Sequence, residues 1–193
     1  MDAEAARLGV TGALYVGKVG ITVPVGMAAW GSEWEDLGYI SGDGITESTA
    51  EDRTDFTPWQ AMSPIRTEVT SAVTTFQATL WETNFNTISL YYRKSAADMT
   101  VTPGTAGKPD VVSFTEGGKP KRDLRAFGVD VVDGIYARRV IAPLGEVTER
   151  GDLVYKSDTL IGYEVTITAY PGADGVSVIR EFREGWSVPD VTP

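Results

Sequence analysis

Carboxylates are the residues of this 193-residue chain whose number and type could support catalysis. The sequence holds 27 Asp and Glu, and it contains neither His nor Cys. Glycoside hydrolysis needs only two carboxylates about 5 to 10 Å apart, so an acidic pair would suffice for that chemistry. Acidic residues are also abundant on ordinary protein surfaces, where they keep a protein dissolved, and their spacing here does not separate the two roles. We therefore predict no catalytic residues.

Metal and cofactor sites have equally little support in the residue types. The absence of His and Cys removes thiolate nucleophiles, imidazole bases and the commonest zinc ligands. Asp130, Asp133 and Gly134 lack the ligand spacing of a calcium loop and fit a strand that runs into a turn. The early glycines form neither a dinucleotide fingerprint nor a P-loop: Gly9, Gly12, Gly17 and Gly20. The sequence predicts no metal, no cofactor and no enzymatic activity.

A cluster of basic residues could contact phosphate. Its members are Lys119, Lys121, Arg122 and Arg125. The net charge of the chain is −10, which opposes nonspecific binding of nucleic acid by the surface as a whole. Four basic side chains in such a chain more often pair with acids on a neighbouring surface. We interpret them as candidate residues of a contact between subunits.

The elements that carry these residues are mainly strands. Residues 162–170 alternate apolar and polar side chains, as a half-buried strand does, and residues 176–182 repeat the pattern. Residues 170–175 hold the Pro, Gly and Asp of a turn, which predicts a C-terminal hairpin. A second hairpin is predicted from 124–132 and 135–142, turning at Asp133 and Gly134. The predicted fold class is mainly β, a sandwich or barrel-like domain with one short flanking α-helix.

The longest predicted strand runs from Ile65 to Glu82. Its apolar side switches from odd to even positions, through Ile65, Val69 and Val73 and then Phe76, Ala78 and Leu80. Because a period of two cannot change phase without an irregularity, we place a bulge near Thr74 and Thr75.

One helix is predicted directly after this strand, over residues 84–93. Phe85, Ile88 and Tyr92 recur at helical spacing, and Thr83 or Asn84 can cap the first turn. The apolar stripe is expected to pack on the sheet.

Two stretches are predicted to be irregular, and the whole chain is predicted to form a single domain over residues 1–193. Residues 43–64 are acidic, contain Pro58 and Pro64 and hold few core-type side chains, which predicts a long exposed loop. Residues 100–125 are rich in Pro and Gly and end in the basic cluster. We expect no secretion signal and no membrane-spanning segment.

Several motifs, taken in order, resemble those of a known family. A W-x-x-L-G-Y-x-S stretch runs from Trp34 to Ser41. It is followed by Trp59-Gln60, by Ile65-Arg66-Thr67, by a strand ending Leu80-Trp81-Glu82, and by Gly162-Tyr163-Glu164-Val165 and Trp186. This order resembles the tail tube proteins of long-tailed phages that infect actinobacteria, over nearly the whole chain.

That resemblance implies a β-sandwich whose copies close in sixes into rings, with the rings stacked into a hollow tube. The loop at 43–64 would then reach the adjacent ring, and its candidate contact residues are Asp43, Glu47, Glu51, Asp52, Arg53, Asp55 and Trp59. The resemblance also implies a virion protein made in the host cytoplasm, with a tape-measure protein and tail terminator or tip proteins as partners. The additional C-terminal immunoglobulin-like domain of some relatives is expected to be absent.

Viral DNA would pass through such a tube without specific binding. A lumen lined with Lys and Arg would hold DNA, whereas an acidic wall repels it, so Glu47, Glu51 and Asp52 are candidate lumen residues. The alternative function that the residues leave open is a β-sandwich carbohydrate-binding or adhesin module.

Overall fold

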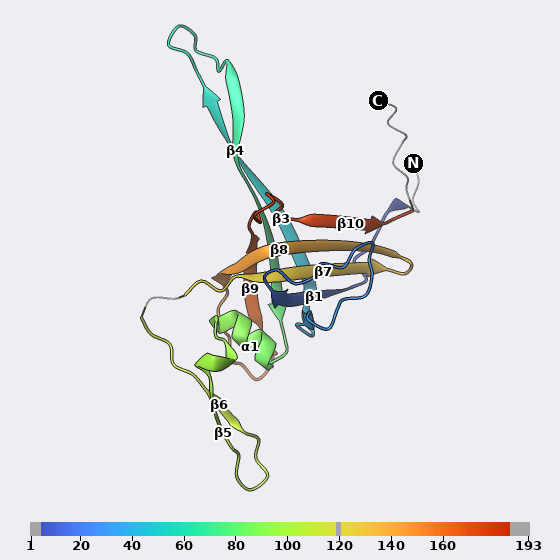
Figure 1. Cartoon of the computed structure of the whole chain (residues 1–193), viewed down its shortest axis with the longest axis vertical. Helices are drawn as coiled ribbons and strands as arrows, with labels where there is room; N and C mark the ends of the chain where they lie inside the picture. The colour runs from blue at the N-terminus through green and yellow to red at the C-terminus, as the bar shows by residue number, and fades with distance from the viewer. Residues whose placement is uncertain (1–4, 119–120, 186–193) are drawn as a thin grey trace.

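An eight-stranded antiparallel sheet forms the body of the protein in a computed structural model that describes residues 5–118 and 121–185 (Figure 1). The strands follow the order β2-β1-β7-β8-β9-β4-β3, and β10 pairs with β8 outside that order. Their bounds are β1 (Thr11–Lys18), β2 (Glu35–Asp36), β3 (Ile40–Phe56), β4 (Arg66–Leu80), β7 (Arg125–Asp133), β8 (Tyr136–Arg150), β9 (Tyr163–Ala169) and β10 (Ile179–Arg183). A separate ribbon joins β5 (Thr100–Thr102) to β6 (Val111–Ser113), and the helical elements are α1 (Phe85–Tyr92) and the 3-10 turn η2 (Ala96–Asp98). The protein is mainly β with one short α-helix, which confirms the predicted fold class.

The sheet curls around one hydrophobic core because apolar side chains alternate along its strands and point to one side. Leu14 of β1 and Ile45 of β3, near opposite ends of the strand order, pack in the same cluster. The strands between them contribute fully buried side chains, among them Phe76, Leu80, Phe127, Val165 and Ile167. Since β1 and β3 do not pair with each other, the sheet resembles a barrel with an open seam between these two strands.

Residues 19–34 cover part of the outer face of the sheet. Trp30 stacks on Tyr15 with ring centroids 4.5 Å apart, and its indole Nε1 donates a hydrogen bond of 2.7 Å to Asp130. The Arg139 guanidinium donates to both oxygens of Asp130, at 2.7 and 2.8 Å, and lies over the Trp30 ring. A Cβ at Gly128 would collide with that ring, so only glycine allows this approach. The sheet is therefore covered on both faces here.

The predicted β7–β8 hairpin is confirmed, whereas the predicted C-terminal hairpin is wrong. Asp133 pairs with Tyr136 across a turn in which Gly134 has a φ of 62°. Both C-terminal strands exist, but β9 pairs with β4 and with the second half of β8, while β10 pairs with the first half of β8. At 15 residues, β8 is long enough to accept β9 and β10 one after the other along the same edge.

The stretch 43–64, which we predicted as a long irregular loop, is mostly strand, and that prediction is wrong. Its residues up to Phe56 belong to β3, which pairs with β4 almost to the end (Figure 1). Polar side chains lie on both faces of this strand, so no apolar face marked it, but pairing with β4 satisfies the backbone groups along one of its edges. The predicted bulge in β4 lies at Thr70, which is skipped between the pairs Asp52–Ser71 and Arg53–Val69, and not at Thr74 and Thr75.

Helix α1 begins and ends as the sequence indicates, but its buried face is rotated from the predicted one. The Asn84 side chain accepts a hydrogen bond of 2.9 Å from the Thr87 backbone nitrogen, and Arg93 closes the helix in a left-handed conformation. Leu90, Tyr91 and Thr87 are buried. Of the predicted packing residues, Ile88 and Tyr92 are partly buried against the core, while Phe85 is 52% exposed and does not belong to the packing face. Phe85 is the first residue of the helix.

Candidate assembly surfaces

The β3–β4 arm is a two-stranded extension of the sheet. β4 pairs with β9 only from Thr75 to Leu80, so the residues of β3 beyond Ser48 and of β4 before Thr75 pair only with each other. At about 3.3 Å per residue, the part of β3 from Thr49 to Phe56 extends roughly 25 Å beyond the last strand that β9 supports. The arm projects from one end of the molecule (Figure 1).

The arm ends in a cluster of exposed apolar side chains, which we call the tip. Its chain reversal lies between Phe56 and Ile65, whose backbone nitrogen donates to the Phe56 carbonyl at 3.0 Å. Trp59 is 99% exposed, and Met62 is equally uncovered. Phe56 and Ile65 are also exposed. Apolar side chains gathered in this way on a surface mark a site that another molecule covers.

Acidic side chains follow the arm from its base to the tip. Asp43 lies at the base, where it accepts a hydrogen bond from Ser41. Glu47 forms an ion pair with Arg180 of β10, and Glu51 pairs with Arg53 at 2.9 Å. The Asp55 carboxylate accepts a hydrogen bond of 2.6 Å from the Thr67 hydroxyl. Of the predicted contact residues, Asp43 and Glu47 lie at the base of the arm, and the others lie on the arm itself: Glu51, Asp52, Arg53, Asp55 and Trp59.

The predicted basic cluster is dispersed within its own chain. Arg122 donates to Glu146 from two nitrogens, and this hydrogen-bonded carboxylate raises the pKa of Arg122. Arg125 contacts Asp123 at 2.8 Å and the Ser89 hydroxyl at 2.7 Å, so it joins β7 to helix α1. Lys121 is exposed. Lys119 lies outside the described residues, as does Trp186 of the motif series.

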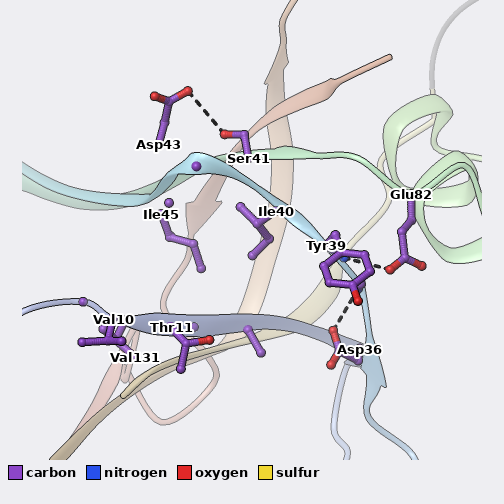
Figure 2. Close-up of a pocket in the computed structure, with 16 residues that line it drawn as sticks. Val10, Thr11, Asp36, Tyr39, Ile40, Ser41, Asp43, Ile45, Glu82 and Val131 are labelled. Atoms are coloured by element: carbon purple, nitrogen blue, oxygen red, sulfur yellow. Dashed lines mark hydrogen bonds between the residues drawn. The ribbon is translucent and has the colours of Figure 1, made fainter. Parts of the chain in front are cut away.

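A groove of about 750 Å³ opens at the seam between β1 and the start of β3 (Figure 2). β1 meets β2 only at Tyr15 and Val16, and β3 has β4 as its single neighbour, so strand edges border the groove. Asp36, Asp43 and Glu82 make its wall acidic. The Asp36 carboxylate accepts a 2.8 Å hydrogen bond from the Gly38 nitrogen, and Glu82 accepts one of 2.9 Å from the Tyr39 nitrogen.

No pattern in the sequence predicted this groove. Gly38 and Gly44, both with positive φ, and Gly42 are the local signal that could have suggested an irregular backbone there. Within residues 5–118 and 121–185, no group of three acidic or other metal-ligating side chains could hold a metal ion. The same part of the chain contains no helix that is both long and apolar enough to span a bilayer.

Comparison with known families identifies the chain. The model of a family described as phage tail tube protein matches residues 1–181. The chain belongs to the phage tail tube protein family. No curated protein matches it.

The arm and its exposed tip agree with membership in the phage tail tube protein family. Proteins of this family are structural components of the virion tail and assemble into a tube, and the family is not a class of enzymes. An apolar tip on an extended two-stranded arm is what a subunit that contacts other copies would present.

Proposed function

We propose that this phage tail tube protein forms rings of six that stack into the hollow tail of a long-tailed phage of an actinobacterial host, and that viral DNA passes through the tube. The observation that carries the proposal is the β3–β4 arm with its uncovered tip. Trp59 is 99% exposed on an arm that reaches beyond the supporting sheet, so the body of its own chain leaves it uncovered. Another copy would bury this area.

Lateral closure of the ring has separate support in the strand edges. Within the described part of the chain, β3 pairs with β4 alone, and the seam between β1 and β3 leaves further edge positions unpaired. Unpaired edges are a liability in a free subunit, and closing a barrel with neighbours removes them. The number six comes from the family resemblance.

The lumen wall is proposed to be acidic, with Glu47, Glu51 and Asp52 as its candidates. The net charge of −10 has the sign that repels phosphate, and DNA would then pass without specific binding. The ion pairs of Glu47 with Arg180 and of Glu51 with Arg53 reduce this repulsion, so the wall needs further acids. In the rival arrangement, the acids lie outside and four basic residues face inward: Lys119, Lys121, Arg122 and Arg125. A tube structure whose wall holds more Lys and Arg than Asp and Glu would contradict the acidic lumen.

The expected partners, besides other copies of the chain, are a tape-measure protein inside the tube and terminator or tip proteins at its ends. Synthesis is expected in the host cytoplasm, followed by incorporation into the virion tail.

Negative-stain electron microscopy of the concentrated, purified chain tests the proposal. We expect hollow rods, or rings with six-fold symmetry, whose number grows with protein concentration. Monomers that persist at high concentration and bind glycans would instead support a carbohydrate-binding or adhesin module. A glycan array run on the same sample distinguishes these two outcomes.

A further inference from the structure

Two β-ribbons project from opposite ends of the molecule along its longest axis. The β3–β4 arm forms one end, and the β5–β6 ribbon forms the other (Figure 1). This ribbon was part of the stretch 100–125 that the sequence predicted to be irregular, and its three residue pairs make it a short antiparallel sheet. The subunit therefore has two different ends.

The β5–β6 ribbon is fixed at its base. Phe114, directly after β6, lies with its ring centroid 5.1 Å from that of Tyr92 at the end of α1. Lys94 donates a hydrogen bond of 2.8 Å from Nζ to the carbonyl oxygen of Thr115. The ribbon is thus held in one direction relative to the body.

The outer part of the ribbon exposes apolar side chains. Val101 and Val112 are direct cross-strand partners, so they lie on the same face, and they are 58% and 54% exposed. Val111 is also exposed. A ribbon of two strands is marginally stable alone in water, and burial of a face against another element stabilises it. We call the Val101–Val112 pair the valine patch.

The two ends differ in charge. Residues 45–76, which include the arm, hold five Asp or Glu and two Arg. Residues 100–113, which form the ribbon and its turn, hold one Lys and one Asp. The acidic arm is therefore repelled by a second arm but not by the neutral ribbon, and this difference favours contact between the unlike ends.

We infer that the tip of the arm on one copy docks on the β5–β6 ribbon of a copy in the next ring, so that Trp59 and Met62 cover the valine patch. The inference rests on the proposed function, since it specifies which surfaces make the axial contact of the tube. The contact is heterologous, because it joins two different surfaces, and with these surfaces at opposite ends of the long axis it can repeat from ring to ring without closing. Lys108, in the turn of the ribbon, lies in the segment that the acidic arm would meet.

Cross-linking between single-cysteine variants tests the inference, since the natural chain has no Cys. Ser63→Cys lies in the tip and Ser113→Cys in the ribbon, and both positions are exposed, so the small change preserves the surface. The two variants are mixed, assembled, treated with a short bismaleimide and separated on a denaturing gel. We expect a dimer from the mixture and none from either variant alone. Ser32→Cys, at an exposed site in the segment that covers the outer face of the sheet, is the matched control and should not cross-link to Ser63→Cys.

The other outcomes overturn the inference. A dimer from Ser63→Cys alone would mean that tips meet tips. A dimer between Ser63→Cys and Thr11→Cys, but not Ser113→Cys, would place the tip in the groove between β1 and β3. If rods form and no pair involving Ser113→Cys cross-links, the axial contact is elsewhere while the proposed function stands. If the natural chain forms no rods or rings, the proposed function itself fails, and the inference fails with it.

A second measurement does not depend on cross-linking. The double change Val101→Thr and Val112→Thr keeps β-branched side chains but removes apolar surface from the patch. We expect the protein concentration needed for tubes to rise at least about tenfold, while Val25→Thr, at an exposed position outside both ends, leaves it unchanged. An unchanged concentration for the double variant would contradict the docking.

Discussion

Replacement of Trp59 by Ala should separate assembly from folding. Trp59 is 99% exposed, so the single subunit loses no packing when its side chain is truncated. Surface substitutions of this kind change the free energy of unfolding by about 0.5 kcal/mol or less. We therefore expect the variant to melt like the natural subunit.

The expected effect on assembly is much larger. A Trp side chain buries about 150 to 250 Å² when it is covered. At roughly 25 cal/mol per Å², this corresponds to about 4 to 6 kcal/mol for each contact. Fixing the side chain costs about 0.5 to 1.5 kcal/mol, which leaves about 2.5 kcal/mol or more. Since 1.4 kcal/mol corresponds to about a factor of ten, the protein concentration needed for tubes should rise at least about fiftyfold.

Trp34→Ala is the matched control with the opposite expected behaviour. Trp34 is 6% exposed and donates from its indole nitrogen to the Thr22 carbonyl at 3.0 Å. Truncation of a buried Trp costs about 3 to 5 kcal/mol, so this variant should melt earlier as a subunit. Pelleting over a concentration series gives the assembly threshold, and thermal melting gives the stability. If Trp59→Ala forms tubes at the same protein concentration as the natural chain, the tip is not a contact surface. If it melts as early as Trp34→Ala, the Trp59 side chain stabilises the subunit itself, and the substitution does not separate assembly from folding.

Three further predictions concern the arm, the helix and acid stability. Amide hydrogens of the arm beyond Ser48 should exchange rapidly in the free subunit and slowly in tubes, because this part has two strands and no third strand supports it. Strong protection in both the free subunit and the tube would contradict the prediction. In denaturant titrations, Leu90→Ala should lower the free energy of unfolding by about 2 to 5 kcal/mol and Phe85→Ala by less than about 1 kcal/mol, because Leu90 is 1% and Phe85 is 52% exposed. Equal losses for the two variants would refute the observed helix face. The hydrogen bond from Arg138, together with Arg7, lowers the pKa of Glu184 below its usual 4.5, so its stabilising contribution is complete above that pH and is lost as the pH falls through the lowered pKa. Glu184→Gln should therefore reduce the acid-induced loss of stability below about pH 4.5, and an unchanged pH profile in chemical denaturation would show that the group does not contribute.

The sequence predicted those elements in which one side of a strand or helix is buried. Tyr163, Val165 and Ile167 alternate with polar residues, and this pattern located β9 correctly. Asn84 similarly predicted the start of helix α1. The arm was missed because neither of its faces enters the core, so its pattern lacks the apolar alternation that identifies a half-buried strand.

Strand partners were harder to predict than strands. The alternation in residues 176–182 indicates a strand but contains no information about which edge it joins, and β8 rather than β9 provides that edge. The predicted helix face lies one position away from the buried residues Thr87 and Tyr91. Spacing alone gives a residue in the first turn, such as Phe85, the same weight as residues in later turns that pack on the core. Among the candidate contact residues, those on the arm lie along one element, whereas Arg122 and Arg125 are engaged within the chain.

The acidic residues of β3 have a consequence for the subunit before it assembles. β3 is an edge strand of 17 residues, and a long free edge is a template for pairing with the same edge of another molecule. Glu47, Glu51, Asp52 and Asp55 lie along it, and an antiparallel or in-register pair of such edges would bring like charges together. The carboxylates thus oppose edge-to-edge aggregation of newly made subunits. They leave the strand available for a partner that presents a different surface.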